Sequence, residues 1–190
     1  QTILSEYINE ADQASNLEAP DYVRMKAQHA YFADVWENIG ERMANTYASE
    51  TPVQARQEIT DLLSTWESSI NNKLWNALTT AFNQNGFELQ SFSSSDDFAI
   101  ALNSFVDNSI EAAVASNDQA DLDLYQSFSD YWNSTVKADW GEYLINGNVL
   151  SQSQIAEIDI KLGDWARNAE PVSNLMFILF LISLAVIFGL

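Results

Sequence analysis

The single histidine, His29, is the only side chain of this sequence that ordinarily acts as a general base or an imidazole metal ligand near neutral pH. Its neighbours at helical spacing are Met25 and Phe32, so it falls in an apolar seam where packing residues lie. Di-iron helical bundles need two Glu-x-x-His pairs, and Lys26 occupies the position three residues before this histidine. We therefore expect a structural role for His29.

Three carboxylates close together in the sequence are the only candidates for a metal site. Asp118, Asp121 and Asp123 fall in the stretch NDQADLD, and carboxylate oxygens are the ligands that calcium prefers. The stretch lacks the glycine and the closing glutamate of an EF-hand loop. We expect the acidic start of a helix here, with calcium binding as the weaker alternative.

The sequence contains no local motif for thiol, serine, phosphate or paired-carboxylate chemistry. The sequence has no cysteine, no Gly-x-Ser-x-Gly motif and no glycine-rich phosphate loop. Its 27 acidic residues allow many carboxylate pairs, but no motif singles out two of them for glycoside hydrolysis. We expect a non-catalytic protein without a cofactor, and an enzyme built on carboxylates is a remote alternative.

The charge of the chain is strongly acidic. Its 27 acidic residues against 8 basic ones give a net charge of −19, and residues 74–136 contain no lysine or arginine. Such a surface repels phosphate backbones, which excludes nucleic acid as a partner. An excess of carboxylates is also typical of proteins from saline media, where salt screens their repulsion.

The segment 172–190 is long, apolar and uncharged, with only Ser173, Asn174 and Ser183 polar. A helix of this length rises about 28 Å, close to the hydrocarbon thickness of a bilayer. The segment predicts one C-terminal transmembrane helix, which divides the chain into an acidic helical-bundle domain, 1–171, and a membrane anchor, 172–190. The anchor residues that we single out are Leu175, Phe177, Phe180, Leu184 and Phe188.

Two features of the sequence bear on which side of the membrane the bundle lies. Lys161 and Arg167 precede the anchor and no basic residue follows it, which by the positive-inside rule favours the cytoplasm. Gln1 opens the chain without a signal-peptide pattern, which fits a mature N-terminus. On balance we expect the bundle on the periplasmic or extracellular side.

Residues 1–171 have the spacing of helices throughout and no strand-type alternation. The expected helices are 2–17, 21–48, 51–85, 94–116, 121–145 and 151–169. Helix 21–48 carries a heptad seam that predicts packing along its whole length, and a capping box at Thr51 starts the next helix, so the two form a long antiparallel hairpin. The prediction is an all-α bundle of five or six helices plus one transmembrane helix.

Two of the six tryptophans stand apart from the apolar faces. Trp75 lies beside its seam and Trp140 lies near a helix end before Gly141, and exposed aromatic residues are enriched at protein contacts. We therefore take these two as candidates for a docking surface.

The pattern as a whole favours a non-catalytic, single-span subunit of a membrane or envelope complex. Its expected partners are the lipid bilayer and other membrane proteins of a respiratory, photosynthetic or virion assembly. The alternative is a surface binding protein or receptor with a ligand cleft between its helices.

Overall fold

The computed structural model describes residues 2–13, 17–116, 118–171 and 183. Over these residues the chain is helical and contains no strand, so the predicted all-α class is confirmed for this part. The described residues form seven α-helices, however, where five or six were expected. The elements are α1 (Thr2–Gln13), α2 (Ala19–Tyr47), α3 (Pro52–Gln84), α4 (Ser95–Ser116), α5 (Gln119–Tyr131), the π-helical segment η1 (Trp132–Lys137), α6 (Gly141–Asn146) and α7 (Gln152–Ala169).

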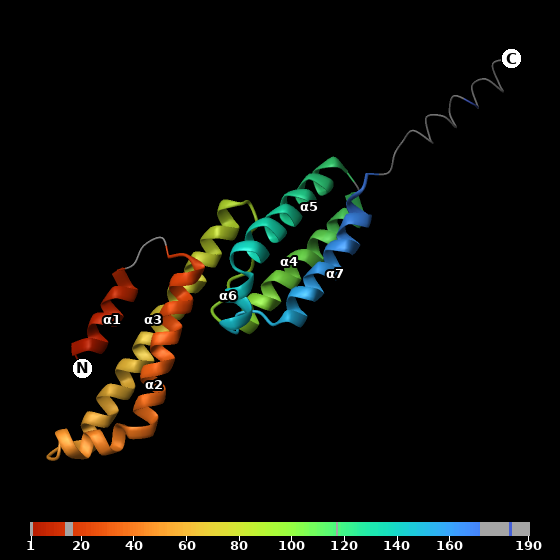
Figure 1. Ribbon diagram of the computed structural model, residues 1–190. Coiled ribbons are helices and arrows are strands. Elements are labelled where there is room, and N and C mark those ends of the chain that lie inside the picture. Colours follow the sequence, from red (N-terminus) through yellow and green to blue (C-terminus); the bar gives the residue numbers. More distant parts are fainter. Residues whose placement is uncertain (1, 14–16, 117, 172–182, 184–190) are drawn as a thin grey trace.

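The first three helices form one bundle, seen at the lower left of Figure 1. Helices α2 and α3 are antiparallel and joined by residues 48–51, which confirms the predicted hairpin. Helix α1 packs against α3, where the rings of Tyr7 and Trp66 stack with centroids 5.1 Å apart. Pro20 lies in the first turn of α2, but Thr51 makes no side-chain capping bond, so the capping box predicted there is wrong.

The seam of α2 is buried over only part of its length. Tyr22 and Met25 are buried, but Met43 is 39% exposed, and Gly40 and Ala44 are buried near the end of the helix instead. Figure 1 shows α2 bending before it reaches the hairpin tip. The bend rotates a different row of residues toward α3, so the expectation of a single seam along the whole helix is wrong.

Helices α4, α5 and α7 form a second bundle, at the upper right of Figure 1. In the connection before α4, Phe87 and Phe92 are buried against the core. The end of α3 joins the two bundles, because the ring of Phe82 packs against those of Phe98 in α4 and Tyr131 in α5. One continuous set of buried residues therefore runs through both bundles.

The expected helix 121–145 is interrupted. Its first part is α5, its middle is the π-helical segment η1, and the chain breaks at Trp140 before α6. Trp132 and Val136 stay buried through η1, and the break then frees α6 to cross over to α2, where Tyr143 packs against Tyr22. Long-range packing therefore overrides the continuous periodicity of the sequence.

The predicted membrane anchor lies outside the described residues, apart from Ser183. Leu175, Phe177, Phe180, Leu184 and Phe188 all belong to the part that is not described. Among the helices in the described ranges, none combines the length and the hydropathy that a bilayer span requires. The transmembrane helix therefore stays a prediction from the sequence.

Candidate functional site

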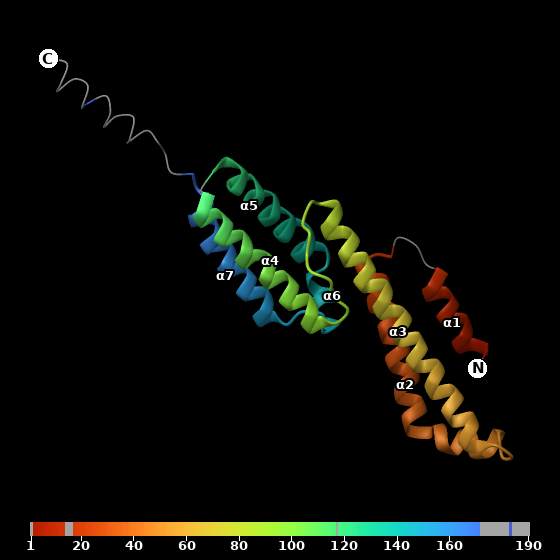
Figure 2. The same ribbon diagram turned by 180° about the vertical axis from the view of Figure 1, so that it is seen from behind.

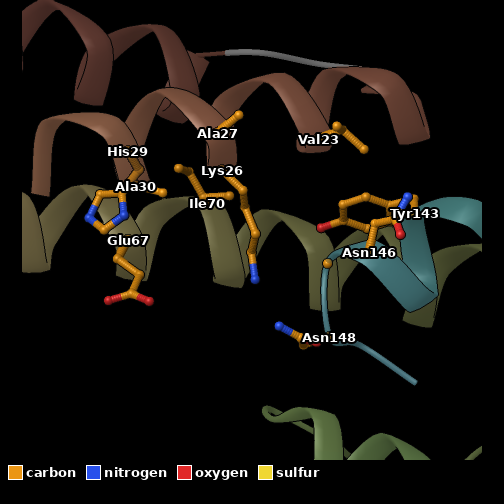
Figure 3. A pocket seen from close by; sticks show the side chains of 11 residues that line it. Val23, Lys26, Ala27, His29, Ala30, Glu67, Ile70, Tyr143, Asn146 and Asn148 are labelled. Carbon is orange, nitrogen blue, oxygen red and sulfur yellow. The ribbon is translucent and has the colours of Figure 1, made fainter. Parts of the chain in front are cut away.

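A cleft opens where α6 crosses the groove between α2 and α3 (Figure 3). Its volume is about 360 Å³, within the range of small-molecule sites. The polar side chains that line it are Lys26, His29, Glu67, Tyr143, Asn146 and Asn148. The cleft therefore gathers a cation, a carboxylate, an imidazole, a phenol and two amides from three separate elements.

Lys26 extends from α2 into the open part of the cleft (Figure 3). Within the described part of the chain, no acidic side chain lies within ion-pair distance of its Nζ, whereas Lys137 and Lys161 each contact an aspartate at 2.8 Å. Burial lowers the pKa of Lys26 from its usual value, and the more distant carboxylate of Glu67 opposes this shift in part. Lys26 is thus a half-buried cation without a direct counter-ion among the described residues.

Tyr143 brings a buried hydroxyl to the same cleft. The residue is 2% exposed, and its Oη has no hydrogen-bond partner among the described residues. In Figure 3 the ring runs inward from α6, with its hydroxyl at the inner end. Burial raises the pKa of Tyr143 well above its usual value, and the nearby Tyr22 adds to the shift. The phenol is therefore neutral, and its hydroxyl is a buried polar group in the wall of the cleft.

The segment after α6 forms the facing wall. Asn148 has φ of +54°, in the left-handed region that asparagine tolerates better than most residues. Its carbonyl accepts a hydrogen bond from Ser95 Oγ at 2.9 Å, and its N–H donates to the Ile145 carbonyl at 3.1 Å. These bonds fix the turn, and the Asn148 amide lies toward the same open space as the Lys26 ammonium (Figure 3).

His29 lies at the other end of the cleft, half-buried beside Trp66. Its Nε2 donates to the Leu63 carbonyl at 3.0 Å, and its ring meets that of Trp66 edge-on with centroids 5.3 Å apart. A carbonyl only accepts, so this bond places a proton on Nε2, and in the neutral imidazole Nδ1 is then the acceptor. Glu67, one turn of α3 further along, lies close by (Figure 3). His29 therefore joins the two helices and also lines the cleft.

The three candidate calcium ligands lie at the start of α5, where all three accept hydrogen bonds. Asp118 Oδ1 accepts from the backbone N–H of Ala120 at 2.8 Å, and Asp121 Oδ2 accepts from the N–H of Asp118 at 3.2 Å. Asp123 accepts from Gln119 Nε2 at 2.8 Å. In the described ranges no group of three acidic, histidine or cysteine side chains is placed to hold a metal ion.

The two candidate docking tryptophans are both packed against the core. Trp75 is only 8% exposed and meets Phe92 edge-on with centroids 6.1 Å apart. Trp140 is half-buried between Tyr22 and Tyr143, with centroids 5.9 and 6.0 Å away. The expectation that Trp75 is poorly covered is wrong, because the loop before α4 covers it. Trp140 keeps part of its surface exposed, so its role in docking stays a prediction.

Sequence reasoning identified one of the polar cleft residues, His29, and missed the others. Lys26 had one usable signal, because it is a basic residue directly beside the buried seam position Met25 in a chain that has few bases. No pattern in the sequence points to Tyr143 or Asn148, because only the crossing of α6 over α2 brings these two residues to the cleft.

We compared the chain with known proteins, and no protein-family model, no curated protein and no solved structure matches it.

Proposed function

We propose that this protein is a non-catalytic, membrane-tethered helical subunit that contacts another protein of a membrane or envelope assembly. The observation that carries the proposal is the position of the uncharged apolar run 172–190 directly after α7, at one end of an elongated molecule. Figure 2 places the end of α7 and the α2–α3 hairpin tip at opposite ends. A bilayer-spanning helix after Pro171 therefore holds the hairpin tip away from the lipid.

The hairpin tip carries the most exposed apolar side chains of the described residues. Tyr47 is 83% exposed and Val53 is 82% exposed, on either side of the turn. Large apolar groups at an exposed tip are typical of protein contacts. Because the net charge is −19, the partner surface that fits best is apolar with a basic rim.

The proposal is tested on the full-length chain in its native membrane. We expect the protein to stay with the membrane through an alkaline wash and to leave it with mild detergent as part of a complex of fixed composition. Recovery as a monomer in aqueous buffer without detergent would overturn both the anchor and the subunit role.

Site-specific photocrosslinking tests the contact at the tip. A photoreactive residue at Tyr47 should crosslink to the same protein that copurifies in detergent. The matched control is Tyr31, which is 67% exposed on the same helix but lies away from the tip, and it should give no crosslink. Crosslinks of equal yield from both positions would contradict a specific contact at the tip.

A second candidate function is a membrane-tethered binding protein for a small ligand. The observation that favours it is the cleft between α2, α3 and α6, where the Tyr143 hydroxyl and the Lys26 ammonium have no direct partners among the described residues. Tyr143→Phe tests this role, since it removes only the hydroxyl. It should weaken ligand binding without lowering the melting temperature, because a buried hydroxyl without a partner destabilises the fold.

A further inference from the structure

We propose that the cleft between α2, α3 and α6 binds a small zwitterion the size of a free amino acid, with its carboxylate at Lys26 and its ammonium at Glu67. This inference rests on the second candidate function above and names the chemical class of the ligand. The cleft's volume of about 360 Å³ accommodates such a molecule and excludes a folded partner.

The carboxylate position follows from Lys26 and its surroundings. A half-buried ammonium loses hydration, and an anionic group of a ligand restores the lost interaction through a charge-assisted hydrogen bond. The amide of Asn148 lies toward the same space and supplies a second donor to a carboxylate (Figure 3). The two donors come from opposite walls, so a carboxylate between them bridges α2 to the turn after α6.

The ammonium position follows from the acceptors at the other end. Glu67 and His29 line the same cleft, and the imidazole has its Nδ1 free because Nε2 donates to the Leu63 carbonyl. A carboxylate and an imidazole nitrogen both accept from an ammonium group. The cleft therefore presents donors at one end and acceptors at the other.

The charge of the whole molecule separates a zwitterion from a simple anion. With a net charge of −19, the chain repels any ligand that carries net negative charge. A zwitterion has no net charge and escapes this repulsion, but it still offers a carboxylate to Lys26. A simple cation gains from Glu67 but meets the positive Lys26 in the same cleft.

Isothermal titration calorimetry of the full-length chain in detergent micelles tests the assignment with three probes of matched size. L-Alanine carries both charges, propionate lacks the ammonium and ethylammonium lacks the carboxylate. We expect L-alanine to bind about tenfold or more tightly than either analogue, the usual effect of removing one charge-assisted hydrogen bond. Propionate binding as tightly as L-alanine would overturn the zwitterion and leave an anion site.

Variants assign the two ends. Lys26→Gln should weaken L-alanine binding by about tenfold or more, while Arg42→Gln, the same charge change near the end of α2, should leave it unchanged. Glu67→Gln should weaken binding of L-alanine and ethylammonium and should not weaken that of propionate, because it removes a negative charge from the cleft. Equal losses from Lys26→Gln and Arg42→Gln would overturn the proposed site, because only general electrostatics would then be at work.

A second experiment separates two outcomes: that the ligand is not a zwitterion, and that the cleft binds no small ligand at all. If none of the three probes binds, the zwitterion is overturned, and a thermal-shift panel of neutral sugars and polyols then tests the cleft itself. Stabilisation by one of these compounds that Tyr143→Phe abolishes would support a binding function for another ligand class. Absence of any stabilisation would overturn the binding function as well.

Discussion

Asp159 on α7 holds two residues of η1 in place. Its Oδ1 accepts from the buried Trp132 Nε1 at 2.8 Å, and its Oδ2 pairs with Lys137 Nζ at 2.8 Å. Asp159→Asn keeps an acceptor for the indole and loses only a partly exposed ion pair, so we expect a loss of about 0–1 kcal/mol in the free energy of unfolding. Asp159→Ala leaves the indole N–H buried and unpaired, at a cost of about 1–3 kcal/mol.

Urea titration followed by circular dichroism measures both Asp159 variants. Asp107→Ala is the matched control. It breaks an ion pair with Lys161 of the same 2.8 Å length, but it leaves no buried donor without a partner. Losses of the same size in Asp159→Ala and Asp107→Ala would contradict the role assigned to the indole bond.

Tyr22 makes the stability of the fold sensitive to alkaline pH. Burial raises its pKa to about 12, and the charge of Asp21 adds to the shift. A group with a raised pKa in the folded state contributes stability below its unfolded pKa of about 10, and that stability is lost as the pH rises to about 12. The slope for one such phenol is at most about 1.4 kcal/mol for each pH unit.

Urea titrations between about pH 9 and about pH 12 test this dependence. Tyr22→Phe should reduce the alkaline slope, although it also loses the hydrogen bond from Tyr22 Oη to the Lys73 carbonyl, 3.0 Å long, which costs about 1 kcal/mol at neutral pH. Tyr47→Phe is the control, because Tyr47 is 83% exposed. An unchanged slope in Tyr22→Phe would assign the alkaline loss to other groups.

At the scale of the elements, replacing either of two glycines with alanine should change the free energy of unfolding in opposite directions, although both glycines have open space around them. Gly86 ends α3 with φ of +82°, where the N–H of Phe87 returns to the Phe82 carbonyl at 3.0 Å in a Schellman-type stop. Gly163 lies within α7, and a Cβ at either glycine meets nothing within 4 Å. Any difference between the two substitutions therefore comes from the backbone alone.

We expect Gly86→Ala to lower the free energy of unfolding by about 1 kcal/mol, because alanine is strained in the left-handed region. Gly163→Ala should raise it by about 1 kcal/mol, because alanine loses less entropy in a helix. Thermal unfolding of the two variants beside the unchanged protein decides the matter. Destabilisation by Gly163→Ala would show that this position is closer to its neighbours than the structure indicates.

The segment η1 is the element whose form the sequence did not predict. A π-helical turn widens the helix by one residue and is found mostly as single turns at functional positions. Here Trp132 and Val136 are buried within the segment, and the helix breaks three residues after it, at Trp140. After the break at Trp140, α6 packs against α2, and Tyr143 and Asn148 line the cleft there.

At the scale of the whole molecule, the excess of acidic residues should make stability depend on salt. A net charge of −19 destabilises the compact state through self-repulsion, and salt screens that repulsion. We expect the melting temperature to rise as sodium chloride increases from about 0.1 M to about 1 M. Differential scanning calorimetry of the full-length chain in detergent micelles measures this rise in melting temperature.

Charge reversal provides the control for the salt effect. Glu111 and Asp130 are exposed and lie in the stretch 74–136 that contains no basic residue. Replacing both with lysine should raise the melting temperature at low salt and flatten its dependence on salt. If the melting temperature of the double variant rises with salt as steeply as that of the unchanged protein, the salt effect comes from stronger apolar burial and not from charge repulsion.

The elements themselves were largely predictable because their signals are local. Caps, prolines and three-four spacing act within one or two turns, so the bounds of α3, α4 and α7 agree closely with the expectation. Ser151 and Gln154 form a capping box at the expected start of α7, with the Ser151 N–H bonded to Gln154 Oε1 at 2.8 Å. The apolar run 172–190 is equally a property of neighbouring residues and needs no fold to be recognised.

The sequence by itself therefore determined the helical class, the long hairpin, the acidic charge and the uncharged apolar segment. Only the tertiary structure decided which side chains meet across the bundles: Trp75 becomes buried, α2 bends, and α6 brings Tyr143 and Asn148 to Lys26. The physical reason is that helix formation is decided by contacts a few residues apart. The cleft depends on packing between residues far apart in the chain, where many alternative pairings share the same local pattern.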